Sequence, residues 1–145
     1  MSRRSIFRIV FLVTLGLILM AAPILPAAAQ PTSATAELGQ TATLVAKGAA
    51  VAVPVVYSCS SDAAGAIDLF VTERVGGNRT AQGNASTFGL VCDGAQHTAV
   101  VTVPSSNGNA FHQGTAFVQG ALSACDPDGI CLTVPFSGTI GVVKK

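Results

Sequence analysis

Beyond residue 40, the apolar and polar positions of the chain alternate with a period of two. Residues 51–59 give the clearest case, because one face of this segment holds Val51, Val53, Val55, Tyr57 and Cys59. Residues 66–73 repeat the pattern and place Phe70 on the face opposite to Leu69. A period of two is that of a half-buried β-strand, and no window after Gln30 carries a helical stripe. The pattern therefore predicts a chain of strands.

Short β-branched segments, separated by Gly, Asn, Asp and Ser, mark the individual strands. They cover residues 41–46, 51–59, 66–73, 86–92, 97–103, 114–122 and 139–143. Tight-turn signals stand between several of them, such as Asp93-Gly94 before residue 97. About seven to nine strands at this short spacing predict an all-β fold, an antiparallel β-sandwich of two sheets.

Some residues inside these segments predict local features. Pro54 has no amide hydrogen, so residues 51–59 are expected to form an edge strand or a bulged one. Gly120 indicates a bulge within residues 114–122. We expect the large side chains of the core to be mostly those of Phe70, Phe88, Phe117, Phe136 and Tyr57.

The N-terminus has the layout of an export signal. Three arginines within the first eight residues precede an apolar run, residues 9–20, and the triplet Ala27-Ala28-Ala29 follows two prolines. This order predicts a secretory signal peptide, residues 1–29, cleaved to leave one secreted domain, residues 30–145. An uncleaved membrane anchor is the alternative. Arg3-Arg4 also leaves twin-arginine export open beside the general secretory route, which we favour.

Charge limits the classes of partner. The whole chain has a formal net charge of +1, and only 10% of its residues are charged. Beyond residue 29, five basic residues stand against seven acidic ones, a net charge of −2. Such a domain attracts neither nucleic acid nor an anionic membrane surface, so we expect no nucleic-acid partner and no membrane association after cleavage. We expect a monomer.

The four cysteines predict two disulfides, since an exported chain with an even number of cysteines is read as a disulfide framework. Of the three connectivities, the one pairing Cys125 with Cys131 is favoured because Pro127 and Asp128-Gly129 form a turn between them. That pairing leaves Cys59 with Cys92. A zinc site would need a Cys-x-x-Cys spacing that the sequence lacks, so we expect no metal.

Candidate catalytic residues are few. The only histidines are His97 and His112. His97 could be imagined in a Ser-His-Asp arrangement with Asp93, but no Gly-x-Ser-x-Gly elbow supplies the serine. The acidic residues fall mostly in turns, where Asp serves the backbone, rather than in pairs for glycoside hydrolysis. We therefore expect no enzyme, no catalytic residue and no cofactor.

Three segments resemble a group of small exported actinobacterial proteins that have no established activity. They are Val53-Pro-Val-Val-Tyr-Ser-Cys59, Cys92-Asp-Gly-Ala-Gln-His-Thr98 and Ala110-Phe-His-Gln-Gly-Thr-Ala-Phe-Val118. The resemblance covers most of residues 40–143 and implies an immunoglobulin-like sandwich. A weaker resemblance, through Cys125 to Cys131, is to neocarzinostatin-type apoproteins, which hold an apolar chromophore in a cleft. Neither resemblance implies a catalytic residue.

Together these features predict a secreted, non-enzymatic, immunoglobulin-like β-sandwich. It would act as a binding or structural module for an unknown protein or small-molecule ligand. The first alternative is a carrier of a small apolar ligand, which predicts a cleft of about 300 Å³ or more lined by some of the Phe residues. The second is a small hydrolase, which predicts that His97 lies within hydrogen-bond reach of an acid and a serine.

Overall fold

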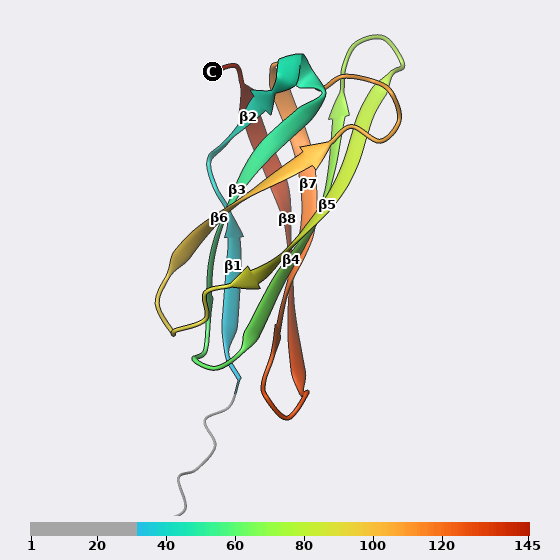
Figure 1. Ribbon diagram of the computed structural model, residues 1–145. Coiled ribbons are helices and arrows are strands. Elements are labelled where there is room, and N and C mark those ends of the chain that lie inside the picture. The colour runs from blue at the N-terminus through green and yellow to red at the C-terminus, as the bar shows by residue number, and fades with distance from the viewer. Residues whose placement is uncertain (1–31) are drawn as a thin grey trace, which may run out of the picture. The chain divides into compact units, whose positions relative to one another are not determined.

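The computed structural model describes residues 32–145, and the segment predicted to be a signal peptide lies outside them (Figure 1). Eight strands and one short 3-10 helix make up the described chain, which confirms the all-β class. The elements are β1 (Ala34–Leu38), β2 (Thr41–Val45), η1 (Ala46–Gly48), β3 (Ala50–Cys59), β4 (Ala64–Arg74), β5 (Thr80–Leu90), β6 (His97–Pro104), β7 (Gly114–Cys125) and β8 (Cys131–Val143). Residues 32–145 contain no helix with the length and hydrophobicity needed to cross a bilayer.

Hydrogen bonds connect all eight strands into a single sheet, where the sequence predicts two separate sheets. The order is β1-β3-β2-β8-β7-β4-β5, and β6 pairs with β3 outside this path. The link is β2, which pairs antiparallel with the start of β3 and parallel with the end of β8. This parallel pair departs from the predicted antiparallel arrangement. β1 and β2 run in the same direction and pair with successive parts of β3. The other edge of β2 pairs with the end of β8, which runs parallel to it.

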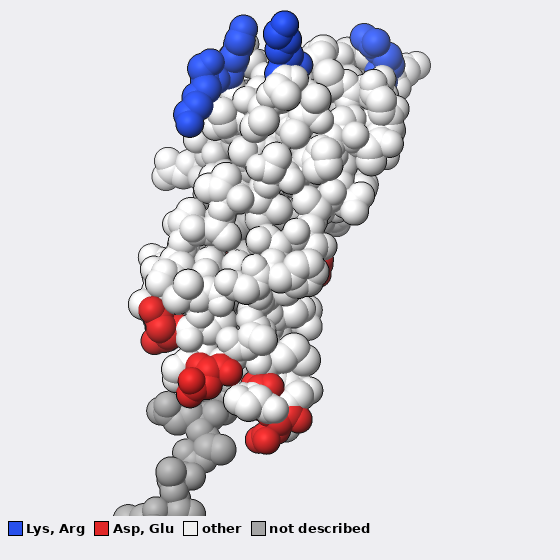
Figure 2. Space-filling view, in the orientation of Figure 1, with Lys and Arg blue, Asp and Glu red and all other residues white. Residues whose placement is uncertain are grey.

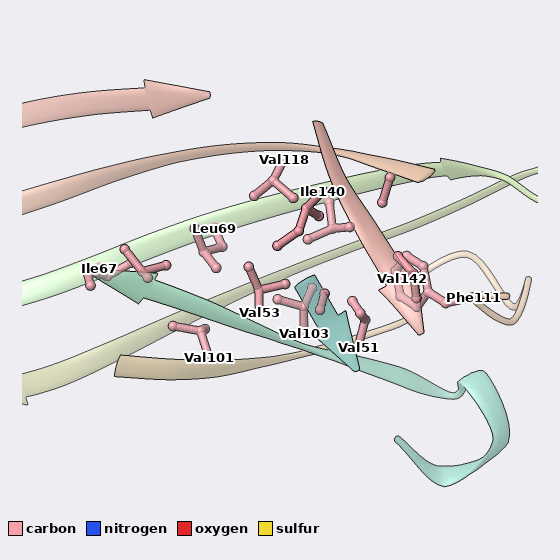
Figure 3. Close-up of a cluster of buried hydrophobic side chains, with 14 of the residues drawn as sticks. Val51, Val53, Ile67, Leu69, Val101, Val103, Phe111, Val118, Ile140 and Val142 are labelled. Carbon is pink, nitrogen blue, oxygen red and sulfur yellow. The ribbon is translucent and has the colours of Figure 1, made fainter. Parts of the chain in front are cut away.

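The two halves of this sheet face each other across the core. One half holds β1, β3 and β6, and the other holds β8, β7, β4 and β5 (Figure 1). Figure 3 shows inward side chains of both halves pointing toward one another, with Val53 and Val103 near Leu69, Val118 and Ile140. Burying such β-branched and aliphatic side chains stabilises the fold by about 25 cal/mol per Å² of apolar surface. The alternation along each strand therefore produces this core directly.

The prediction of the aromatic core residues is wrong for three of the five. Phe70, Phe88 and Phe117 are 40%, 76% and 43% exposed. Tyr57 is buried and Phe136 is half-buried, while Phe111, which the sequence did not single out, is 1% exposed. The reason is the period of the strands: Phe70 alternates with Leu69 and Val71, so burying those two turns Phe70 outward.

Pro54 lies in an inner strand, which corrects the predicted edge or bulge. β3 is flanked by β6 on one side and by β1 and then β2 on the other. Pro54 falls where β1 has ended, at Leu38, and β2 has not begun, and its carbonyl accepts a hydrogen bond from the Gly39 amide. The nitrogen and carbonyl of one strand residue point to the same side, so the missing donor faces this gap and leaves no strand partner unsatisfied.

Gly120 is not a bulge either. The pairing of β7 with β4 and β8 runs through it without a shift, and the register shift in this region lies between Gly65 and Ala66, where β4 pairs with β5. A Cβ at Gly120 would lie 2.5 Å from Leu69 Cδ2 and 2.6 Å from Phe136 Cζ. Glycine is present here because two core side chains approach the backbone closely.

Two disulfides are present, in the pairing that the sequence favours. Cys59–Cys92 joins the end of β3 to the residues after β5. Cys125–Cys131 closes the link between β7 and β8, where the two cysteines pair directly across the hairpin. Both disulfides lie at the same end of the strands, and the short one fixes a protruding hairpin (Figure 1).

Candidate functional site

The exposed phenylalanines share one surface, the outward face of β5, β4 and β7. We call it the aromatic face and define it by Phe70, Phe88 and Phe117. Phe70 of β4 pairs with Gln119 of β7, and Phe117 pairs with Thr72, so the two rings are diagonal neighbours across the strand pair. Phe88 of β5 pairs with Ala66 of β4. Strand pairing thus sets three large apolar groups on one side of the sheet.

Polar, nearly uncharged side chains surround these rings. A shallow hollow of about 360 Å³ lies around Phe70, with Asp68, Asn84, Ser86 and Gln119 in its lining. The Ser86 hydroxyl donates a hydrogen bond to the Asp68 carboxylate. The amides of Asn84 and Gln119 each offer a donor and an acceptor to a ligand. The arrangement can therefore bind a partner through aromatic contact with hydrogen bonds at its margin.

The charged side chains are separated to the two ends of the strands. Figure 2 shows Lys and Arg gathered at one end and most of the Asp and Glu gathered toward the other. We call the first the basic end; it holds all five basic residues of the described chain, Lys47, Arg74, Arg79, Lys144 and Lys145. The acidic end holds Asp62, Asp93, Asp126 and Asp128 in the links β3–β4, β5–β6 and β7–β8. The separation follows from topology, because every link at one end is basic or neutral and every link at the other is acidic.

A hollow of about 630 Å³ opens at the basic end. Leu44 and Phe111 line it together with His112, Gln113, Lys47, Lys144 and Lys145. The volume exceeds the ~300 Å³ named for the carrier alternative, but Phe111 is almost wholly buried and the lysines make this hollow cationic rather than purely apolar. It therefore suits a ligand that has an apolar part and negative charge.

Next to this hollow lies Glu73, the one charged side chain that is buried in residues 32–145, with 2% of its surface exposed. The backbone N–H of His112 donates a hydrogen bond of 2.8 Å to Glu73 Oε2. Burial raises the pKa of the Glu73 carboxyl above its ordinary 4.5, while the His112 N–H and the charge of His112 act in the opposite direction. Glu73 thus ties the segment that carries Phe111 and His112 to the end of β4.

His97 is paired with an acid, as the hydrolase alternative requires, but it has no serine partner among the described residues. His97 Nε2 lies 2.8 Å from Asp93 Oδ1, and the same oxygen accepts a hydrogen bond from the Ala95 amide. These two bonds hold the pKa of Asp93 below its ordinary value. The His97 ring also lies 5.8 Å from the ring of Tyr57. The pair therefore fastens the β5–β6 turn beside the Cys59–Cys92 disulfide.

Of the predicted site residues, the four cysteines are all disulfide-bonded. Within residues 32–145, no cluster of three or more His, Cys, Asp or Glu is placed to hold a metal ion. Neither the aromatic face nor the hollow at the basic end was predicted from the sequence, although the sequence contains a feature that points to each. Phe70 stands on the face opposite to Leu69, and from η1 onward the links alternate between basic or neutral ones and acidic ones.

No protein-family model and no curated protein matches the chain. Its function is therefore inferred from the residues and geometry described above.

Proposed function

We propose that this chain is a secreted, non-enzymatic, immunoglobulin-like β-sandwich protein that binds a partner through its aromatic face. Three phenylalanines on one outward face are the observation that carries the proposal, because each is 40% exposed or more. Aromatic residues are enriched where proteins bind partners, since they provide large rigid contacts at low cost in conformational entropy.

The place of action is supported by the cysteines. Both disulfides are formed, and such bonds persist in oxidising compartments rather than in the cytoplasm. An oxidising location agrees with the signal peptide that residues 1–29 predict. Mass spectrometry of the protein recovered from its native culture medium tests export: it should report a chain that starts at Gln30 and lacks the four thiol hydrogens. A chain retaining residues 1–29 in the cell membrane would contradict secretion.

The immunoglobulin-like interpretation is supported by the way the sheet folds back on itself. Side chains of β3 and β6 meet those of β4 and β7 in one core, and β2 pairs with both β3 and β8. In such sandwiches, function is located on the outer faces and loops rather than in the core.

The experiment for the aromatic face compares binding to the surface of the producing cells. Purified protein is added to washed cells, and the fraction that sediments with them is measured. The double variant Phe70→Ser/Phe117→Ser should lower this binding by about tenfold or more, because two central aromatic contacts are lost. Val100→Ser, which removes an apolar side chain from β6 that is even more exposed, at 65%, is the control and should bind like the original chain. Equal binding by all three proteins would overturn the proposal.

A second candidate function is the carriage of a small ligand in the hollow at the basic end. The observation in its favour is the hollow of about 630 Å³ with Phe111 in its lining. Native mass spectrometry of the protein from its own medium tests this function. A retained small molecule that is lost in a Leu44→Lys variant would support it. A mass equal to that of the polypeptide alone would contradict it.

A further inference from the structure

We propose that the acidic end of one molecule docks on the basic end of a second copy, giving a reversible head-to-tail association. The proposal does not use the aromatic face, which stays free for another partner. It rests on the shape and charge of the two ends. The contact is between two different surfaces of the same chain, so it can continue from copy to copy instead of closing as a symmetric dimer.

The acidic end carries a fixed apolar projection. Ile130 stands in the β7–β8 hairpin and is 68% exposed. Its carbonyl accepts a 2.9 Å hydrogen bond from the Asp126 amide, and its own amide donates a 2.8 Å bond to Asp126 Oδ1. The Cys125–Cys131 disulfide closes the base of the same hairpin. Little conformational entropy therefore remains to be lost when Ile130 is buried by a partner.

The basic end carries the complement. Its hollow of about 630 Å³ offers the half-buried Leu44 as an apolar contact, with Lys47, Lys144 and Lys145 around it. Phe111 also lines the hollow but is itself almost wholly buried. The docking hairpin would bring Asp126 and Asp128 beside Ile130. An isoleucine flanked by two carboxylates thus meets a partly apolar hollow that is lined by three ammonium groups. Both the hydrophobic contact and the charges favour the same pairing.

Charge separation also selects the direction of approach. Two acidic ends repel each other, as do two basic ends, and only the head-to-tail encounter is attractive. A hairpin in a hollow covers less surface than the ~1,200–2,000 Å² of total area that stable interfaces bury. We therefore expect weak association that grows with concentration. The monomer expected from the sequence is the form at low concentration and at high salt.

Sedimentation velocity on the exported protein tests the proposal. Association should appear as concentration rises at about 20 mM salt and fall by tenfold or more at about 500 mM, where the Debye length shrinks from ~20 Å to ~4 Å. Ile130→Ser should weaken association at least tenfold. The matched control, Val100→Ser, removes a side chain of similar exposure from β6 and should leave it unchanged. Glu37→Lys, on the exposed side of β1, is the matched charge control and should have little effect.

A mixing experiment separates head-to-tail docking from other contacts. The first variant, Lys47→Glu/Lys145→Glu, keeps only the acidic end functional, and the second, Asp128→Lys/Ile130→Ser, keeps only the basic end. Each variant alone should stay monomeric, and an equimolar mixture should form a dimer and nothing larger. Circular dichroism spectra matching that of the original chain show that both variants are folded.

Three results would overturn the proposal. The original chain could remain monomeric at low salt and millimolar concentration. Its association could persist in both end variants but disappear in Phe70→Ser/Phe117→Ser, which would place the contact on the aromatic face. Finally, the basic end could bind inorganic phosphate or another anion while no self-association is detected, which would assign the hollow to a small ligand.

Discussion

Glu73 is a carboxyl group held in the interior by a single backbone donor. Burial of the charged form is costly, so the folded protein favours the protonated form and the pKa is raised above 4.5. A group with a raised acidic pKa contributes fully to stability below its ordinary pKa. That contribution is lost as the pH rises from 4.5 through the folded-state pKa. The negative charge of Glu73 therefore opposes folding at neutral pH.

Glu73→Gln removes this charge and keeps an oxygen for the His112 amide. We expect the free energy of unfolding of the variant to match that of the original chain near pH 4 and to exceed it increasingly toward pH 7. Urea unfolding at several pH values measures the difference. Glu37→Gln, at an exposed carboxylate on β1, is the control and should give no such trend. Parallel curves for Glu73→Gln and the original chain would contradict the assignment.

Gly83 is where the open edge of β5 meets the end of β6. It forms an isolated bridge with Ser105, and the Ser106 amide donates a 2.7 Å hydrogen bond to the Gln82 carbonyl. A Cβ at Gly83 would collide with the Pro104 carbonyl oxygen and approach Val103 Cγ1 to 2.9 Å. The glycine therefore permits the close approach that covers this strand edge.

Gly83→Ala should lower the free energy of unfolding by about 1–3 kcal/mol, since the backbone of β6 must move to accommodate the methyl group. The matched control is Gly141→Ala in β8, where a Cβ meets no atom within 4 Å and the change should stay within about 0.5 kcal/mol. Thermal or urea unfolding measures both. Equal effects at the two positions would show that the approach of β6 to Gly83 contributes nothing to stability.

At the scale of the element, strands with β-branched alternation were predictable and three others were not. β1 (Ala34–Leu38) was not predicted at all, and β5 and β8 begin earlier than predicted. β3 and β6 start and end within one residue of the predicted limits. β5 begins at Thr80 rather than residue 86. The sequence hid its first half because Ala81, Gly83 and Asn84 have low strand propensity. Pairing with β4 nevertheless holds these residues in the strand. β8 begins at Cys131 although Pro135 follows, because β2 pairs only with its last residues and leaves that side of Pro135 open.

The two candidate surfaces differ in how far the sequence alone could predict them. The exposure of Phe70 follows from its alternation with Leu69, so it could be predicted from the sequence alone. The hollow at the basic end could not, because Leu44 and Phe111 come from segments whose proximity is set by tertiary packing. Side-chain alternation can be read from neighbouring residues, whereas the proximity of Leu44 and Phe111 depends on how distant segments of the chain pack together.

The two disulfides close loops of very different length, with sequence separations of 33 and 6. Replacing Cys59 and Cys92 by Ala should cost about 4 kcal/mol of unfolding free energy, and replacing Cys125 and Cys131 about 2 kcal/mol, since a longer loop leaves the unfolded chain more entropy to regain. Urea titrations of the two double variants measure this order. A larger loss for the short loop would mean that local geometry outweighs chain entropy.

For the whole molecule, the distribution of aromatic residues divides stability from recognition. Phe111→Ala should cost about 3–5 kcal/mol because it opens a cavity in the core. Phe88→Ala, at a ring that is 76% exposed, should change stability by about 0.5 kcal/mol or less. Calorimetric unfolding of the two variants provides the comparison. Similar losses would imply that the aromatic face is covered in the folded protein.

The parallel pairing of β2 with β8 has a mechanical consequence. The described chain enters at the acidic end through β1 and leaves at the basic end after β8, so tension between its two ends pulls β2 and β8 in opposite directions along their length. The pairs Thr41–Gly141, Ala42–Val142 and Thr43–Val143 are then loaded in shear, all at once, instead of being peeled apart one after another. A molecule connected at both ends, to a surface or to further copies, would yield to stretching only when this short ladder ruptures as a unit.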